Sequence, residues 1–240
     1  MGIISKIRSE FLSNYLRQKQ AVFSRLEQEV FDQTQRDHEI ISCHNGCAYC
    51  CSVYIEASLK ECEAIVYHLY QNEEVLISFL RKYPDWRSRT RQLADLCTKN
   101  LNLVREKEQC EKVYRNLTDA LLFYKLQNIA CPFFNESSCS LYSARPFTCA
   151  AHFVTTPPEW CSPLDSREPK IYKGSFVDEI ADLSFYNEQL SDPGITLMQV
   201  KVYEIIQKDR AYLSQTNGLP AFEYVEMNNS KIAAILRTYL

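Results

Sequence analysis

The sequence predicts a mainly α-helical protein with an irregular segment, rich in cysteine and proline, that folds around a metal centre. Apolar residues recur at helical spacing over long stretches of the 240 residues. Prolines interrupt every periodic pattern between residues 129 and 173. The chain has 11 cysteines, and four of them fall within residues 43–51. A chain of this length can bury a sizeable core without covalent cross-links, so the cysteines need another explanation.

Two helices are predicted around the first group of cysteines. Residues 3–36 place apolar side chains on one face and charged side chains on the other, which is typical of a long amphipathic helix. Ser58 is followed three residues later by Glu61, the pattern of a capping box, in which each side chain accepts a hydrogen bond from the other residue's backbone. The second helix is therefore expected from about residue 59 to residue 70.

The middle of the chain is also predicted to be helical. Residues 73–82 have the pattern of a short helix, which is expected to stop at Pro84, and Asp85 can cap the helix that follows. From residue 86 to about residue 126 there is neither glycine nor proline, and the apolar stripe is broken. This stretch predicts one long helix or two helices joined by a kink.

Further helices are expected in the C-terminal part of the chain. Residues 176–183 restart a helical pattern, and SDPG at 191–194 has the composition of a turn. Residues 195–214 and 230–240 predict two more helices. No internal repeat and no strand-rich region is found in the sequence. The expected organisation is a single domain over residues 1–240, with an N-terminal helix (1–36), a cysteine-cluster core (40–161) and C-terminal helices (175–240).

Composition and charge restrict the class of partner. With 27 Lys and Arg against 30 Asp and Glu, the net charge is -3, which gives no broad basic surface for nucleic acid. No stretch approaches about 18 consecutive apolar residues, so no membrane-spanning helix is expected. The N-terminus mixes charge into its apolar residues and lacks the pattern of a secretory signal. We therefore expect a cytoplasmic protein whose partner is an unidentified protein or small molecule.

The first four cysteines have the spacing of metal ligands. Cys43, Cys47, Cys50 and Cys51 read C-x3-C-x2-C-C, and Gly46 between them readily adopts the positive φ of a tight turn. Cytoplasmic thiols stay reduced and the number of cysteines is odd, so a disulfide framework is disfavoured. Short spacings favour thiolate binding to a soft or borderline metal. The alternative is that these thiols are buried and inert, or that Cys50 and Cys51 form a vicinal disulfide.

The proline-rich segment carries four more candidate ligands, Cys131, Cys139, Cys149 and Cys161. They are too far apart for one local knuckle, so loops have to bring them to the first group. Metal–thiolate bonds can offset the modest entropic cost of closing such loops. Adjacent side chains diverge, so Cys50 and Cys51 are not expected to bind one ion together. Either the two thiols bind two different metals or two irons of one cluster, or one thiol binds a metal while the other only packs against the protein.

Several residues near the cysteines allow two interpretations each. His152, which forms C-x2-H with Cys149, and His44 are either metal ligands or structural histidines. Arg145 either donates hydrogen bonds to a thiolate cluster or is an ordinary surface arginine. Tyr142 is expected in the core. The remaining cysteines lie in helical patterns and are predicted to be small core residues: Cys62, Cys97 and Cys110.

The cysteine motifs resemble those of the YkgJ-type cysteine-cluster family, whose members are described as carrying a zinc- or iron-chelating domain. The resemblance is carried by CHNGCAYCC at 43–51, by the S-x-x-E helix start after it and by CPFFNESSCSLYSARPFTC at 131–149. It covers residues 40–161 and implies a metal-chelating domain. Relatives are described as Fe–S oxidoreductases and, more distantly, as a flagellin lysine methylase. The chain departs from the family at Ala150, where an arginine is frequent, and in its terminal helices.

The expected cofactor is an iron–sulfur cluster of the 4Fe–4S type, with zinc as the alternative. All-sulfur ligation, the Cys131-Pro132 pair and the usage of the YkgJ-type family favour iron. We expect a metal-binding protein without an assigned reaction. The alternatives are a zinc-binding structural or interaction module, and an Fe–S-dependent oxidoreductase or methylase-like protein-modifying enzyme. A conventional methyltransferase is disfavoured because the five glycines form no G-x-G motif.

Overall fold

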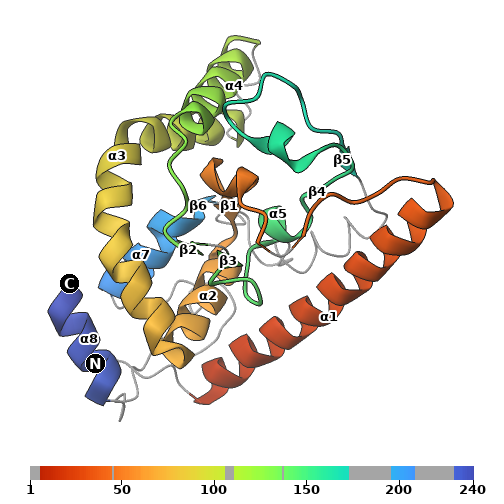
Figure 1. Ribbon diagram of the computed structural model, residues 1–240. Coiled ribbons are helices and arrows are strands. Elements are labelled where there is room, and N and C mark those ends of the chain that lie inside the picture. Colours follow the sequence, from red (N-terminus) through yellow and green to blue (C-terminus); the bar gives the residue numbers. More distant parts are fainter. Residues whose placement is uncertain (1–5, 45, 106–110, 137, 173–195, 209–229) are drawn as a thin grey trace.

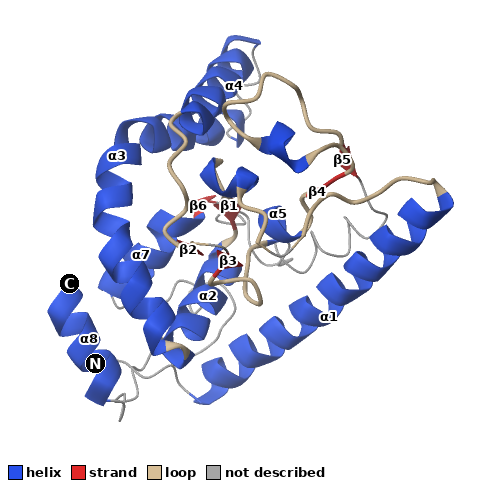
Figure 2. Ribbon diagram, in the orientation of Figure 1, coloured by secondary structure: helices blue, strands red, loops and turns tan. Residues whose placement is uncertain are grey.

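The computed structural model describes residues 6–44, 46–105, 111–136, 138–172, 196–208 and 230–240 (Figure 1). This part of the chain is mainly helical, as predicted, and its strands are short (Figure 2). The α-helices are α1 (Lys6–Arg36), α2 (Leu59–Gln71), α3 (Glu73–Arg105), α4 (Glu111–Leu126), α5 (Phe147–Ala150), α7 (Met198–Lys208) and α8 (Ser230–Tyr239). Two 3-10 helices, η1 (Tyr49–Ser52) and η2 (Pro158–Cys161), lie in the cysteine-bearing segments.

In the described part of the chain, the strands form three antiparallel pairs, and each strand is two residues long. They are β1 (Glu56–Ala57), β2 (Phe134–Asn135), β3 (Ser138–Cys139), β4 (Phe153–Val154), β5 (Ile171–Tyr172) and β6 (Thr196–Leu197). β2 pairs with β3 and β4 with β5, which orders the proline-rich segment locally. β1 pairs with β6 and thereby joins the end of the first cysteine group to the start of α7. Pairs this short hold loops in place but form no layer of the fold.

The first two predicted helices are confirmed. α1 occupies the described part of the N-terminal range, and α2 begins at Leu59, directly after Ser58. The Glu61 N–H donates to Ser58 Oγ at 3.2 Å, and the Ser58 N–H donates to Glu61 Oε2 at 3.1 Å. The capping box predicted from the sequence is therefore formed.

Replacing Ser58 by alanine is expected to lower the free energy of unfolding by about 1 kcal/mol, because the Glu61 N–H loses its acceptor at the start of α2. Urea unfolding of the variant measures this loss. Ser88→Ala is the matched control, since the exposed Ser88 hydroxyl in α3 donates only to the Asp85 carbonyl of its own helix. A loss in Ser58→Ala no larger than that in the control would show that the cap contributes nothing.

The predicted helix break at Pro84 is wrong. α3 continues through Pro84 to Arg105 and curves along its length (Figure 1). Proline removes one backbone hydrogen bond and crowds the preceding turn, so it opposes a helix at this position. Phe79 and Leu80 before the proline and Trp86 after it are buried in the same core. Packing of these large side chains stabilises the continuous helix against the local penalty.

The described residues within 86–126 form two helices, the C-terminal part of α3 and α4, and α4 packs against α3. Of the two predicted arrangements, two helices rather than one long helix is therefore closer to the structure. The helix predicted at 176–183 and the turn at 191–194 lie outside the described residues. α7 and α8 confirm a helix within each of the last two predicted ranges, 195–214 and 230–240.

The main core lies between α2, α3 and α7 and includes side chains of the proline-rich segment. Phe133 of that segment stacks on Phe79 of α3, with 4.3 Å between the ring centroids. Leu141 is also fully buried in this core. The irregular segment is therefore anchored by apolar packing on both sides of Cys139. No helix in the described part of the chain is both long and apolar enough to cross a membrane.

α1 lies along one side of the molecule and touches two different parts of it (Figure 1). Near its start, Leu12 and Tyr15 pack against Ala64 of α2. Further along, Phe23 and its apolar neighbours pack with Ala150 of α5. The apolar face of α1 thus spans from α2 to the short helix that carries Cys149.

Candidate metal centre

Cysteines from both sequence segments surround one cavity of about 110 Å³. Its walls include Cys43, Cys47, Cys50 and Cys51 from the first group and Cys131, Cys139 and Cys149 from the proline-rich segment. The two groups are far apart in the sequence, so only the tertiary fold brings them together. The eighth candidate ligand, Cys161, is not among the described residues that line the cavity.

A tight turn followed by η1 presents the first four cysteines. Gly46 has a φ of 95°, in the left-handed region that glycine adopts without steric cost. The Cys47 N–H donates to the His44 carbonyl at 3.0 Å, and the Cys51 N–H donates to the Ala48 carbonyl at 2.9 Å. These bonds curl the chain so that the four neighbouring cysteines border the same space.

Hydrogen bonds of the backbone attach the proline-rich segment to this turn. The Cys131 N–H donates to the Cys51 carbonyl at 2.8 Å, and the Ser42 N–H donates to the Val154 carbonyl at 2.9 Å. The Val154 N–H in turn donates to Cys43 Sγ at 3.3 Å. These hydrogen bonds therefore join the two cysteine-bearing segments directly.

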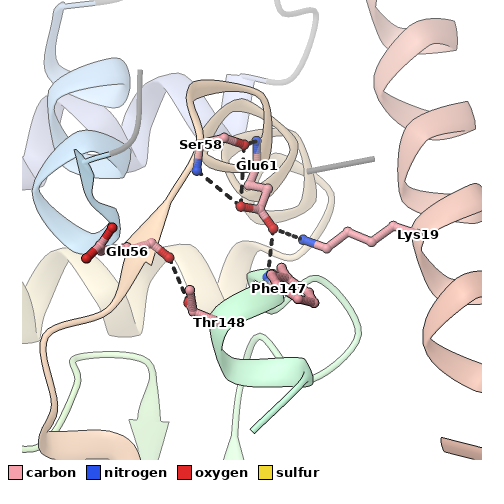
Figure 3. Close-up of polar contacts among 6 residues, drawn as sticks. All are labelled: Lys19, Glu56, Ser58, Glu61, Phe147 and Thr148. Atoms are coloured by element: carbon pink, nitrogen blue, oxygen red, sulfur yellow. Dashed lines mark hydrogen bonds and ion pairs between the residues drawn. The ribbon is translucent and has the colours of Figure 1, made fainter. Parts of the chain in front are cut away.

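The short helix α5, which carries Cys149, is held in place by the buried carboxylate of Glu61 (Figure 3). Glu61 Oε1 accepts a hydrogen bond from the Phe147 N–H, at the start of α5, at 2.7 Å. The same oxygen pairs with Lys19 Nζ of α1 at 2.9 Å, and these two side chains are only 2% and 0% exposed. Three helices, α1, α2 and α5, therefore meet at one carboxylate close to the cavity.

Burial makes several thiols of the cavity weaker acids. It raises the pKa of Cys131 to about 12, because a thiolate loses its hydration there. Burial also raises the pKa of other cysteines in the wall: Cys43, Cys47, Cys139 and Cys149. A cation placed among these sulfurs would have the opposite effect, since it favours the thiolate form.

The neighbouring side chain of Cys51, together with burial, raises the pKa of Cys50. The described cysteines are all free thiols. Cys161 lies in η2, which packs against η1. Burial raises the pKa of Cys161 to about 11, and the thiols of Cys50, Cys43 and Cys47 add to the effect. Cys161 is therefore near the first group although it does not line the cavity.

His44, His152 and Arg145 also line the cavity. Burial lowers the pKa of His152, which keeps its imidazole neutral near pH 7. The Cys43 thiol donates to the His152 carbonyl at 3.5 Å, so the backbone of His152 contacts a candidate ligand. Both histidines therefore border the same space as the thiols.

The other residues singled out from the sequence have separate environments. Tyr142 is 42% exposed, so its predicted place in the core is wrong. Its ring instead packs against the guanidinium of Arg145 at the cavity wall. Cys62 and Cys97 are fully buried core residues, as predicted. Cys110 lies outside the described residues.

Sequence reasoning missed three side chains that support the cavity. Lys19 is buried. It lies four residues after Tyr15 and four residues before Phe23, and this spacing could have indicated that the lysine is on the apolar face of α1. Glu61 was recognised only as a helix cap. Gln199 Nε2 donates to Cys131 Sγ at 3.3 Å across 68 residues of sequence. No local pattern marks such a distant partner.

In the part of the chain that the structure describes, no group of three or more His, Cys, Asp or Glu side chains has the arrangement of a metal site. The cysteines border a common space without converging on one point. Comparison with models of protein families, with curated proteins and with solved structures finds no match. Membership of the YkgJ-type family therefore stays a prediction from the two cysteine motifs.

Proposed function

We propose that this protein binds metal through the cysteines of the cavity and carries an iron–sulfur cluster, of the 4Fe–4S type, between residues 43–51 and 131–149. The observation that carries the proposal is the meeting of seven cysteines from two distant segments at one cavity. Structural cysteines are ordinarily scattered through a core as small apolar residues, as Cys62 and Cys97 are here. The resemblance of the same two segments to the YkgJ-type family supports the same function.

The chemistry of the lining residues fits such a cluster. The described residues of the wall include no carboxylate, and sulfur ligands select soft metals, iron–sulfur clusters and zinc. The cavity of about 110 Å³ is larger than the roughly 30 Å³ that one water molecule occupies in the liquid, so it has room for a core of several atoms. Apolar side chains, among them Ile55, Phe133 and Met198, also line the wall.

A second cavity favours catalysis at this centre as the alternative function. It has a volume of about 600 Å³ and shares His44, Gly46 and Cys47 with the first cavity. Ser52 also lines it, and the buried hydroxyl of Ser52 has no hydrogen-bond partner among the described residues. A small molecule in this space would lie beside the cysteines, as an Fe–S-dependent oxidoreductase or protein-modifying enzyme requires. A purely structural zinc module requires no such space.

Anaerobic purification, followed by analysis of iron, zinc and acid-labile sulfide and by absorption spectroscopy, tests the proposal. We expect about four irons and four sulfides per chain and broad absorption in the visible range. Cys97→Ala is the control, because Cys97 is buried in α3 away from the cavity and its loss should leave the metal content unchanged.

Two results would contradict the proposal in different ways. Zinc without visible absorption would remove the cluster and support the zinc-binding structural module. No metal, either in the protein as purified or after anaerobic reconstitution with iron and sulfide or with zinc, would refute metal binding altogether.

A further inference from the structure

Two contacts hold Arg145 at the wall of the cavity and leave part of its guanidinium unpaired. Its Nη2 donates to Glu27 Oε1 of α1 at 2.9 Å, and its guanidinium carbon lies 3.9 Å from the centre of the Tyr142 ring. The Nε–H is buried and has no hydrogen-bond partner among the described residues. A buried donor without a partner is energetically costly, and an acceptor in the cavity would remove that cost.

Arg145 gives the cavity its permanent positive charge. Among the described lining residues it is the one side chain that stays charged at every physiological pH, and no carboxylate accompanies it in the wall. It lines the same cavity as thiols of both cysteine segments, among them Cys43, Cys139 and Cys149.

The partner carboxylate anchors Arg145 without cancelling its charge in the cavity. The Glu27 side chain is 45% exposed, so water screens it, whereas the Arg145 side chain is only 15% exposed. α1 makes a second contact beside this pair, since Gln20 Nε2 donates to the Ser143 carbonyl at 3.2 Å. α1 therefore fixes both the backbone before Arg145 and the guanidinium itself.

We propose that Arg145 stabilises the negative charge of the metal–thiolate centre, with its Nε–H donating to a sulfur of that centre. This inference rests on the proposed function. Four thiolates outweigh the positive charge of Zn²⁺ or of the iron–sulfide core, so the centre is anionic. A guanidinium in a cavity lined mostly by cysteine and apolar side chains lowers the energy of this anion, and does so most strongly after reduction adds one more negative charge. Arg145 is thus a positioning and charge-compensating residue rather than a ligand.

The test compares Arg145→Met and Arg145→Lys with Arg81→Met in the reconstituted holoprotein. Arg81 also stacks on a tyrosine, Tyr239, but does not line the cavity. We expect Arg145→Met to release metal to a chelator at least about tenfold faster than the wild type. Its midpoint potential should shift to a more negative value, because the reduced centre loses its compensating charge. Arg145→Lys should retain part of the effect, since lysine keeps the charge but lacks the planar donor, and Arg81→Met should match the wild type.

Glu27→Ala keeps the test decisive if Arg145→Met does not fold, because it preserves the charge of Arg145 and removes the carboxylate that accepts its hydrogen bond. It should release metal faster than the wild type. Release rates and potentials equal to those of the wild type, in Arg145→Met or, if that variant is unfolded, in Glu27→Ala, would overturn the role of Arg145 while leaving metal binding intact. A wild-type protein that takes up no metal would instead refute the proposed function. If the centre contains zinc, the role of Arg145 is decided by the metal release rates of the same variants alone.

Discussion

Replacing Cys149 by serine is expected to remove most of the bound metal and to lower the free energy of unfolding of the holoprotein by several kcal/mol. Cys149 borders the cavity from α5, together with Cys50, Cys131 and Cys139. A serine hydroxyl is a poor ligand for a soft metal. Because metal–thiolate binding contributes on the order of 10 kcal/mol in small structural sites, losing one ligand should cost a large part of that stabilisation. Metal analysis and thermal unfolding, with and without a chelator, measure both effects.

Cys47→Ser tests whether the first cysteine group holds the same centre as Cys149. If the two segments share one centre, both variants should lose metal to a similar extent. Cys97→Ala, outside the cavity, controls for the loss of a thiol as such. Full metal content in Cys149→Ser, or metal loss in only one of the two variants, would show that the segments do not bind metal jointly.

Replacing Glu61 by glutamine is expected to lower the free energy of unfolding by about 3–5 kcal/mol. The variant leaves the Lys19 ammonium without a counter-charge at a position where the lysine side chain is only 2% exposed. It also weakens the acceptor of the Phe147 N–H, which starts the helix carrying Cys149. We therefore expect metal content to fall together with stability. Urea unfolding and metal analysis of the same preparation measure the two quantities.

A double-mutant cycle with Lys19→Met separates the buried charge from the shape of the site. Lys19→Met/Glu61→Gln should recover much of the stability lost in Glu61→Gln, because no unpaired charge remains. Glu111→Gln is the matched control, since Glu111 pairs with Arg115 on the exposed surface of α4 and should contribute less than about 0.5 kcal/mol. A Glu61→Gln effect as small as that of the control would contradict a stabilising buried ion pair.

Local patterns predicted the helices well wherever they agreed with the packing of the molecule. The capping box of Ser58 and Glu61 marked the start of α2, because its two hydrogen bonds join residues three positions apart. Pro84 gave a misleading signal because the local cost of a proline is smaller than the gain from burying Phe79, Leu80 and Trp86 in one core. The sequence shows that local cost but does not show the core that offsets it.

The sequence by itself determined most of the helical segments and the two stretches that carry the clustered cysteines, because each of these depends on residues within a few positions of one another. Only the tertiary structure decided which cysteines border one cavity, and it left Cys161 out of the wall. It also decided that Glu27 anchors Arg145 across 118 residues and that Lys19 reaches Glu61 across 42. The physical reason is that a buried charge or donor is satisfied by whatever group the fold places within hydrogen-bonding distance, and sequence spacing does not encode that distance.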